Sequence, residues 1–189
     1  RLAYSVADVE NILRDIPPGM DSLYERALEQ LSKSARGQHL IKAILRWTVC
    51  AIRPLTLAEL DHALQLDLRE NILALDNFIA STCWQFVQVD KIGKVSLIHD
   101  TVRVFLLWKD LQSEFAVDLT EAHSRIADVC LLYLTGSDMK PPRNQKLMHL
   151  YRLKVSKRGP LVNYICEHFS QHLRRSHPED TIRFGSLCD

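Results

Sequence analysis

The sequence predicts a mainly α-helical protein: a winged helix, meaning a helical domain with one β-hairpin, flanked by N-terminal helices and a C-terminal helical extension. Three observations predict this class. Apolar residues recur at helical spacing through most of the chain, a strong helix-capping signal lies at Thr56–Glu59, and two β-rich runs with a glycine turn follow it. We predict domains at residues 1–36, 37–110 and 111–189.

Two helices are predicted before residue 37. Apolar residues recur every three or four positions over Val6–Ile16, and the Pro-Pro-Gly sequence that follows ends this first helix. Ser22 and Glu25 form an S-x-x-E capping box, which predicts a second helix that ends near Ser34.

The next two helices open the predicted winged helix. An apolar stripe predicts a helix over Gln38–Ile52, and Pro54 ends it because the residue before a proline is pushed out of the α region. Leu55–Leu60 combines a T-x-x-E capping box with a hydrophobic staple, so a helix starts here and continues to about Leu66.

A helix-turn-helix followed by a hairpin completes the predicted domain. A further helix would place Ile72, Leu75, Ile79 and Cys83 on one face. The β-rich runs Gln85–Val89 and Lys94–Ile98 are separated by Asp90-Lys91-Ile92-Gly93, whose glycine can take a positive φ angle. A helix from His99 to about Trp108 then follows.

Two more helices are predicted after the winged helix. Apolar spacing predicts one over Thr120–Thr135, and Gly136–Gly159 has the prolines and irregular pattern of a connector. Pro160 opens a final helix that ends near Arg175.

Composition excludes several classes of protein. The hydrophobic fraction of 47% and the formal net charge of +1 are those of an ordinary globular chain. The five scattered cysteines look like free core thiols, and neither a signal peptide nor an apolar run of membrane-spanning length is visible. We therefore expect a cytoplasmic segment without membrane contact. Because the chain starts at Arg1, close to a helical pattern, we also expect it to be part of a longer protein.

No catalytic constellation can be assembled from the residue pattern. The glycines do not form a phosphate-binding loop with lysine and Ser/Thr at the required offsets, so we expect no nucleotide hydrolysis and no bound cofactor in this segment. His168 and His172 are four residues apart on a predicted helix, but a third metal ligand is missing. We therefore predict no metal site and no enzyme.

The charge distribution argues against binding to duplex DNA. The segment from Pro54 to Cys83 contains five acidic residues and one basic residue, Arg69, and such a surface repels phosphate. The segment from Lys140 to Arg175 contains nine basic residues and one acidic residue. That basic region is either a solvated surface that complements an acidic neighbour or a docking face for an anionic partner.

Several motifs resemble the region that follows the NACHT domain in fungal NOD-like STAND NTPases, a region also labelled as a GPI inositol-deacylase-like winged helix. Leu13–Arg26 resembles the LP-x-GL-x-x-x-YER signature of these proteins. Trp47 with Arg53–Leu60 is similar to their W-…-RPLTLEEL entry into the winged helix, and Leu97–Asp100 is similar to their histidine motif after the wing.

The resemblance implies a regulatory switch and not an enzyme. In that family the module packs on the preceding NACHT domain, and the histidine contacts the β-phosphate of ADP; His99 is the matching residue here, and Ile98 replaces the methionine of the MHD form. The full-length protein would then bind ADP or ATP and form a homo-oligomer on activation. Free amides at a helix N-terminus favour an anion, and we expect Asp100 to cap that helix. A DNA-binding winged helix and a plain protein-interaction scaffold are the alternatives.

Overall fold

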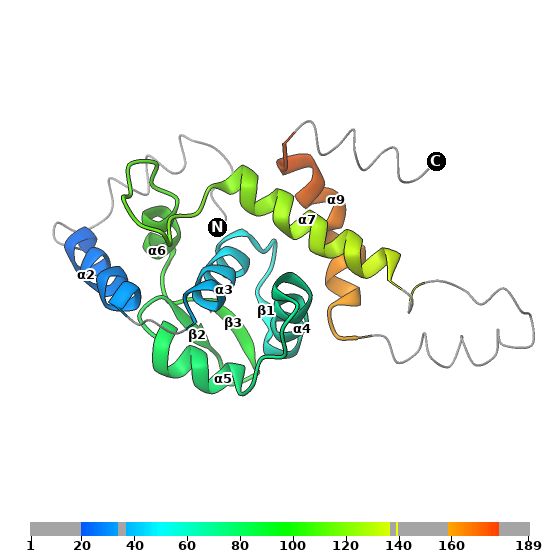
Figure 1. Ribbon diagram of the computed structural model, residues 1–189, viewed down its shortest axis with the longest axis horizontal. Helices are drawn as coiled ribbons and strands as arrows, with labels where there is room; N and C mark the ends of the chain where they lie inside the picture. The colour runs from blue at the N-terminus through cyan, green and yellow to red at the C-terminus, as the bar shows by residue number, and fades with distance from the viewer. Residues whose placement is uncertain (1–19, 34–36, 137–138, 140–158, 178–189) are drawn as a thin grey trace, which may run out of the picture. The chain divides into compact units, whose positions relative to one another are not determined.

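The computed structural model describes residues 20–33, 37–136, 139 and 159–177, and Figure 1 traces its helices and strands. These residues form a mainly α-helical structure with one small antiparallel sheet, as predicted. The helix predicted over Val6–Ile16 and nearly all of the connector predicted over Gly136–Gly159 lie outside the described residues.

Contacts divide the described chain into two compact units. The first unit holds the residues up to 57 together with 73–119, and the second holds 58–72 together with the residues from 120 onward. The domain boundaries predicted at residues 36 and 110 stay a prediction.

The first unit combines helices with a three-stranded sheet. Its helical elements are α2 (Met20–Lys33), α3 (Gln38–Cys50), α5 (Leu75–Phe78), the π-helical turn η1 (Ile79–Cys83) and α6 (Asp100–Leu106). Its strands are β1 (Leu55–Thr56), β2 (Val87–Val89) and β3 (Lys94–Leu97), and their order in the antiparallel sheet is β1-β3-β2. The predicted hairpin is thus confirmed, and Gly93 in its turn has a φ angle of 77°.

The helix start predicted at Thr56 is confirmed, because α4 begins at Leu57, but one strand was missed and two local predictions were wrong in detail. Leu55 and Thr56 form a short strand that pairs with β3, which the helix-capping signal did not reveal. α2 begins at Met20, so Ser22 lies inside the helix and is not its N-cap residue. The helix predicted from Ile72 begins only at Leu75 and changes to π-helical winding at Ile79.

The core of the first unit forms where α3 packs on the sheet. Ile41, Ile44, Leu45 and Trp47 on α3 are completely buried, and Figure 1 shows α3 beside β3, with which it makes contacts. Burial of such side chains contributes about 1.5–3 kcal/mol each, so this helix contributes strongly to the stability of the unit.

The second unit consists of three helices: α4 (Leu57–Leu68, whose first residue belongs to the first unit), α7 (Leu119–Thr135) and α9 (Val162–Arg175). An ion pair with a buried carboxylate links two of them. Arg125 Nε on α7 donates to Asp67 Oδ1 at 2.6 Å, and Arg125 Nη2 donates to the Asp67 carbonyl oxygen at 2.7 Å. Because the Asp67 side chain is only 1% exposed, Arg125 supplies the charge that makes its burial tolerable.

The described cysteines fit the sequence prediction in most cases. Cys50, Cys83 and Cys130 are free and buried, whereas Cys166 is exposed. Burial raises the pKa of the Cys83 and Cys130 thiols to about 12, so both stay protonated and unreactive. In the part of the chain that the structure describes, none of the helices has the length and apolar character needed to cross a bilayer.

Two glycines with positive φ angles form a matched pair for a test of packing. Gly37 precedes α3 with φ 80°, and a Cβ built there would lie 3.1 Å from the ring of Phe78. A Cβ built on Gly93 would meet no atom within 4 Å.

We expect Gly37→Ala to destabilise the chain more than Gly93→Ala. Both changes place a side chain on a left-handed residue, which costs about 1–2 kcal/mol, but only the first also displaces a packed aromatic ring. Urea unfolding followed by circular dichroism measures both losses. Equal losses would contradict the packing role of Gly37.

Candidate functional site

The candidate residue His99 lies where β3 passes into α6. It is the N-cap residue of α6, with an extended backbone, and its Nδ1 accepts a hydrogen bond from the Thr101 main-chain N–H at 3.2 Å. The prediction that Asp100 caps this helix is therefore wrong, because Asp100 is the first residue inside it. The ring thus accepts from one of the main-chain N–H groups that the sequence analysis expected to be free to bind an anion.

A buried hydroxyl pair extends from His99 into the core of the first unit. Thr101 Oγ1 lies 2.8 Å from His99 Nδ1 and 2.9 Å from the hydroxyl oxygen of Tyr24 on α2. Tyr24 and Thr101 are 3% and 6% exposed. Sequence reasoning missed this connection, because the two hydroxyls are 77 positions apart and no local periodicity links them.

Aromatic packing and an arginine hold the elements on which these residues lie. The Tyr24 ring lies 5.2 Å from the Phe105 ring and 6.1 Å from the Phe86 ring, measured between centroids. Arg103 on α6 donates to the main-chain carbonyl of Val49 on α3. α6 is thus fixed to both α2 and α3, and with it the backbone that places His99.

The outer side of the site is open to solvent. His99 and Asp100 are exposed, and Ile98 beside them is 40% exposed. No residue that the structure describes forms a hydrogen bond with His99 Nε2, the ring nitrogen opposite the capping bond. The arrangement offers a fixed imidazole and a neighbouring apolar side chain to whatever contacts this surface.

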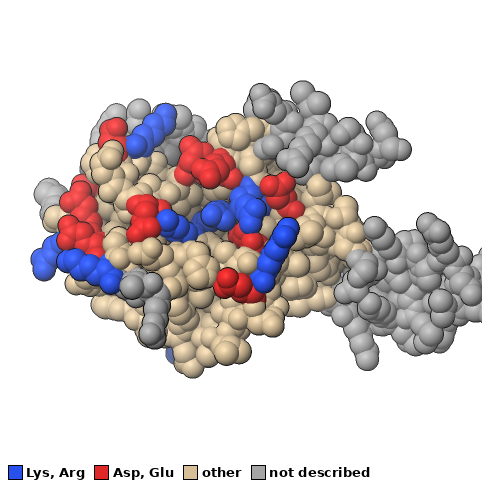
Figure 2. All heavy atoms as spheres, in the orientation of Figure 1, with Lys and Arg blue, Asp and Glu red and all other residues tan. Residues whose placement is uncertain are grey.

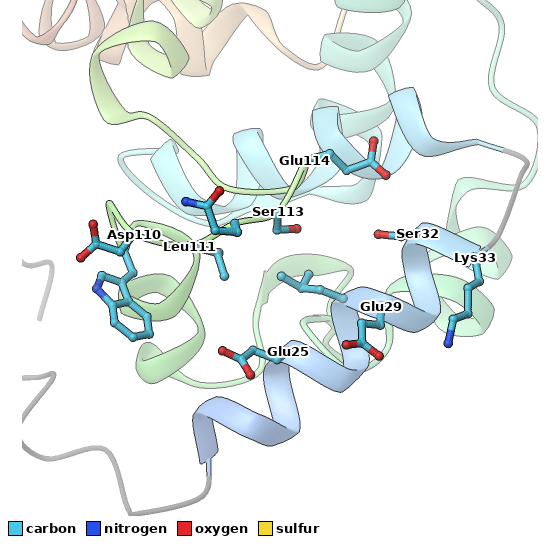
Figure 3. Close-up of a pocket in the computed structure, with 11 residues that line it drawn as sticks. Glu25, Glu29, Ser32, Lys33, Asp110, Leu111, Ser113 and Glu114 are labelled. Carbon is cyan, nitrogen blue, oxygen red and sulfur yellow. The ribbon is translucent and has the colours of Figure 1, made fainter.

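A hollow of about 740 Å³ also opens in the first unit, between α2 and the segment that follows α6. Figure 3 shows Glu25, Glu29 and Asp110 around it, with Lys33 at one end. Glu114, another lining residue, pairs with Lys42 at 2.8 Å. This acidic lining repels phosphate, and His99 does not line the hollow, so we separate it from the candidate site.

The histidines considered as metal ligands are used in another way. In the second unit His172 Nδ1 lies 2.8 Å from His123 Nδ1, and His172 Nε2 lies 2.7 Å from the Tyr164 hydroxyl. Both ring nitrogens of His172 are therefore engaged. Within the described residues no three His, Cys, Asp or Glu side chains gather in a metal-binding arrangement.

Comparison with known proteins supports the fold of the first part of the chain. Residues 28–118 match the family model described as GPI inositol-deacylase, winged helix domain. This chain contains a winged-helix domain. The matched range of the winged-helix domain includes His99 and Thr101 but not Tyr24. No curated protein and no solved structure shows a significant match to the chain.

The histidine pair of the second unit generates a prediction on acid stability. Burial, followed by the charge of Arg175, lowers the pKa of His123 to about 4. Burial lowers the pKa of His172 to about 3, with smaller effects from His123, Arg175 and His168. In the unfolded chain both histidines take up protons near pH 6.5, so the unfolded state binds more protons between pH 6.5 and about 4.

We expect the second unit to lose stability as the pH falls from 6.5 towards 4, while the contribution of the neutral pair is fully present above pH 6.5. Thermal unfolding at a series of pH values measures the loss. The double variant His123→Gln/His172→Gln should start with a lower melting temperature but show a weaker dependence on pH in this window. An unchanged pH dependence in the double variant would contradict the assignment of this loss of stability to His123 and His172.

Proposed function

We propose that this chain is the non-catalytic regulatory winged-helix module of a NACHT/STAND signalling NTPase. In this proposal it packs on a preceding nucleotide-binding domain and controls the ADP/ATP switch of a fungal receptor for innate immunity or heterokaryon incompatibility. His99 contacts the ADP phosphate, and the module binds no cofactor alone. The partner is intramolecular, a homo-oligomer forms on activation, and the location is cytoplasmic.

One observation supports the proposal most: a histidine that caps a helix and is oriented by Thr101 stands on an exposed surface of the winged-helix domain. Thr101 engages His99 Nδ1, while the ring as a whole is exposed beside Ile98. A histidine needed only as a helix cap is an unusual choice, since Ser, Thr, Asp and Asn are the preferred N-cap residues. The position also matches the histidine motif that follows the wing in the resembling proteins.

DNA binding has less support from the surface chemistry. α5 and η1, which occupy the second helix of the predicted helix-turn-helix, contain Asp76 and no lysine or arginine. On the face drawn in Figure 2 basic and acidic side chains are interspersed among the described residues. A duplex-binding face would instead gather several cations against the phosphates. A plain protein-interaction scaffold would show no response to nucleotide.

We expect His99→Asn to reduce bound ADP in the protein that joins this chain to its preceding nucleotide-binding domain. Asparagine is a good N-cap residue but too short to reach a ligand outside the helix, so it separates capping from ligand contact. Loss of one hydrogen bond to a charged phosphate should weaken ADP binding by about tenfold or more.

The measurement is the ADP released on denaturation of the purified protein, together with the affinity for added ADP. His177→Ala, which removes another exposed histidine, is the matched control and should leave both unchanged. His99→Ala should lose bound ADP and also about 1 kcal/mol of stability, because the cap is lost. Full retention of ADP by His99→Asn would reject the proposal, and salt-dependent DNA binding would favour the alternative.

A further inference from the structure

The hydrogen bonds around His99 determine which of its nitrogens bears the proton. A main-chain N–H can only donate, so the bond from Thr101 N requires a lone pair on His99 Nδ1. In the neutral ring the proton is then on Nε2. The exposed side of the ring therefore presents a hydrogen-bond donor.

The same reasoning gives the direction of the two remaining bonds. With a lone pair on His99 Nδ1, the short contact of 2.8 Å requires the Thr101 hydroxyl to donate to it. That hydroxyl has one hydrogen, so at its 2.9 Å contact with Tyr24 it accepts and the tyrosine O–H donates. The result is a continuous chain of donors from Tyr24 through Thr101 to His99.

Each member of this chain is buried except the last. Tyr24 and Thr101 are buried, and the Tyr24 ring contacts Phe86 and Phe105. His99 is exposed, and all its hydrogen bonds to described residues go through Thr101. One of these two bonds, the one from the Thr101 hydroxyl, continues to a tyrosine on a different helix, α2.

We propose that Tyr24 and Thr101 are positioning residues, which hold His99 with its Nε2–H directed outward and thereby couple the placement of α2 to the ligand contact. The ligand class that fits this donor is a hydrogen-bond acceptor; its identity as an ADP phosphate oxygen rests on the proposed function. Loss of the Tyr24 hydroxyl bond removes the donor that orders the Thr101 hydroxyl, and the His99 ring is then held by the main-chain bond from Thr101 alone.

The first test needs no nucleotide. In the 189-residue chain with labelled histidine, NMR measures the tautomer of His99 and the order parameter of its Cε1–H bond. Wild type should show a rigid ring with the proton on Nε2. Tyr24→Phe and Thr101→Val should show a more mobile ring, although the proton stays on Nε2 because both variants keep the main-chain N–H of residue 101. Thr101→Ser keeps the hydroxyl and should restore the wild-type signature. Tyr133→Phe, which removes the hydroxyl of a tyrosine in the second unit, should have no effect.

Both test variants preserve the shape of the core, because phenylalanine keeps the ring contacts of Tyr24 and valine has the volume of threonine. Amide spectra of the same samples check that the fold is retained. An unchanged His99 ring in folded Tyr24→Phe and Thr101→Val would overturn the inference.

The second test separates the inference from the proposed function. In the protein that includes the nucleotide-binding domain, Tyr24→Phe should weaken ADP binding by about two- to tenfold, the range expected for one neutral hydrogen bond. If the NMR signature changes but His99→Asn keeps its ADP, the proposed function fails and the positioning of His99 stands. If His99→Asn loses ADP while the ring in Tyr24→Phe stays rigid, the inference fails and the proposed function stands.

Discussion

The packing of α3 against β3 is the constraint on which the rest of the first unit depends. Ile44, Leu45 and Trp47 on α3 are completely buried, and β3 is the central strand, paired with β1 on one side and β2 on the other. α6 follows β3 directly, and Arg103 attaches it to the end of α3. The position of His99 is therefore a consequence of core packing and not of a flexible loop.

Long elements with one apolar face were predictable from sequence, because their hydrophobic period is set by residues that lie close together in the chain. α3 and α7 begin and end within two residues of the predicted limits. β1 was missed since it has only two residues and exists through its pairing with β3. The cap of α6 was assigned to Asp100 on propensity, whereas the buried Thr101 selects His99 instead. Contacts between distant segments decide such cases.

Two histidine environments in this chain show why residue type alone does not define a site. His172 is completely buried, both its ring nitrogens are engaged, and its pKa is lowered to about 3, so its role is to complete a core. His99 has one nitrogen fixed by Thr101 while the ring remains exposed. A histidine with one ring nitrogen held by the protein and the rest of its ring accessible can contact a ligand.

The proposed switch needs an element whose position both a ligand and the remaining protein can influence. α2 satisfies the second condition, because it contacts α6 and reaches Thr101 through a single hydroxyl, while an acidic hollow flanks its other residues. One neutral hydrogen bond contributes about 0.5–1.5 kcal/mol, which is small against a buried helix face but sufficient to bias the orientation of an exposed ring. This hydroxyl bond can break and reform while the Tyr24 ring stays packed on Phe86 and Phe105, so the His99 ring can change its orientation without unfolding α3 or the sheet.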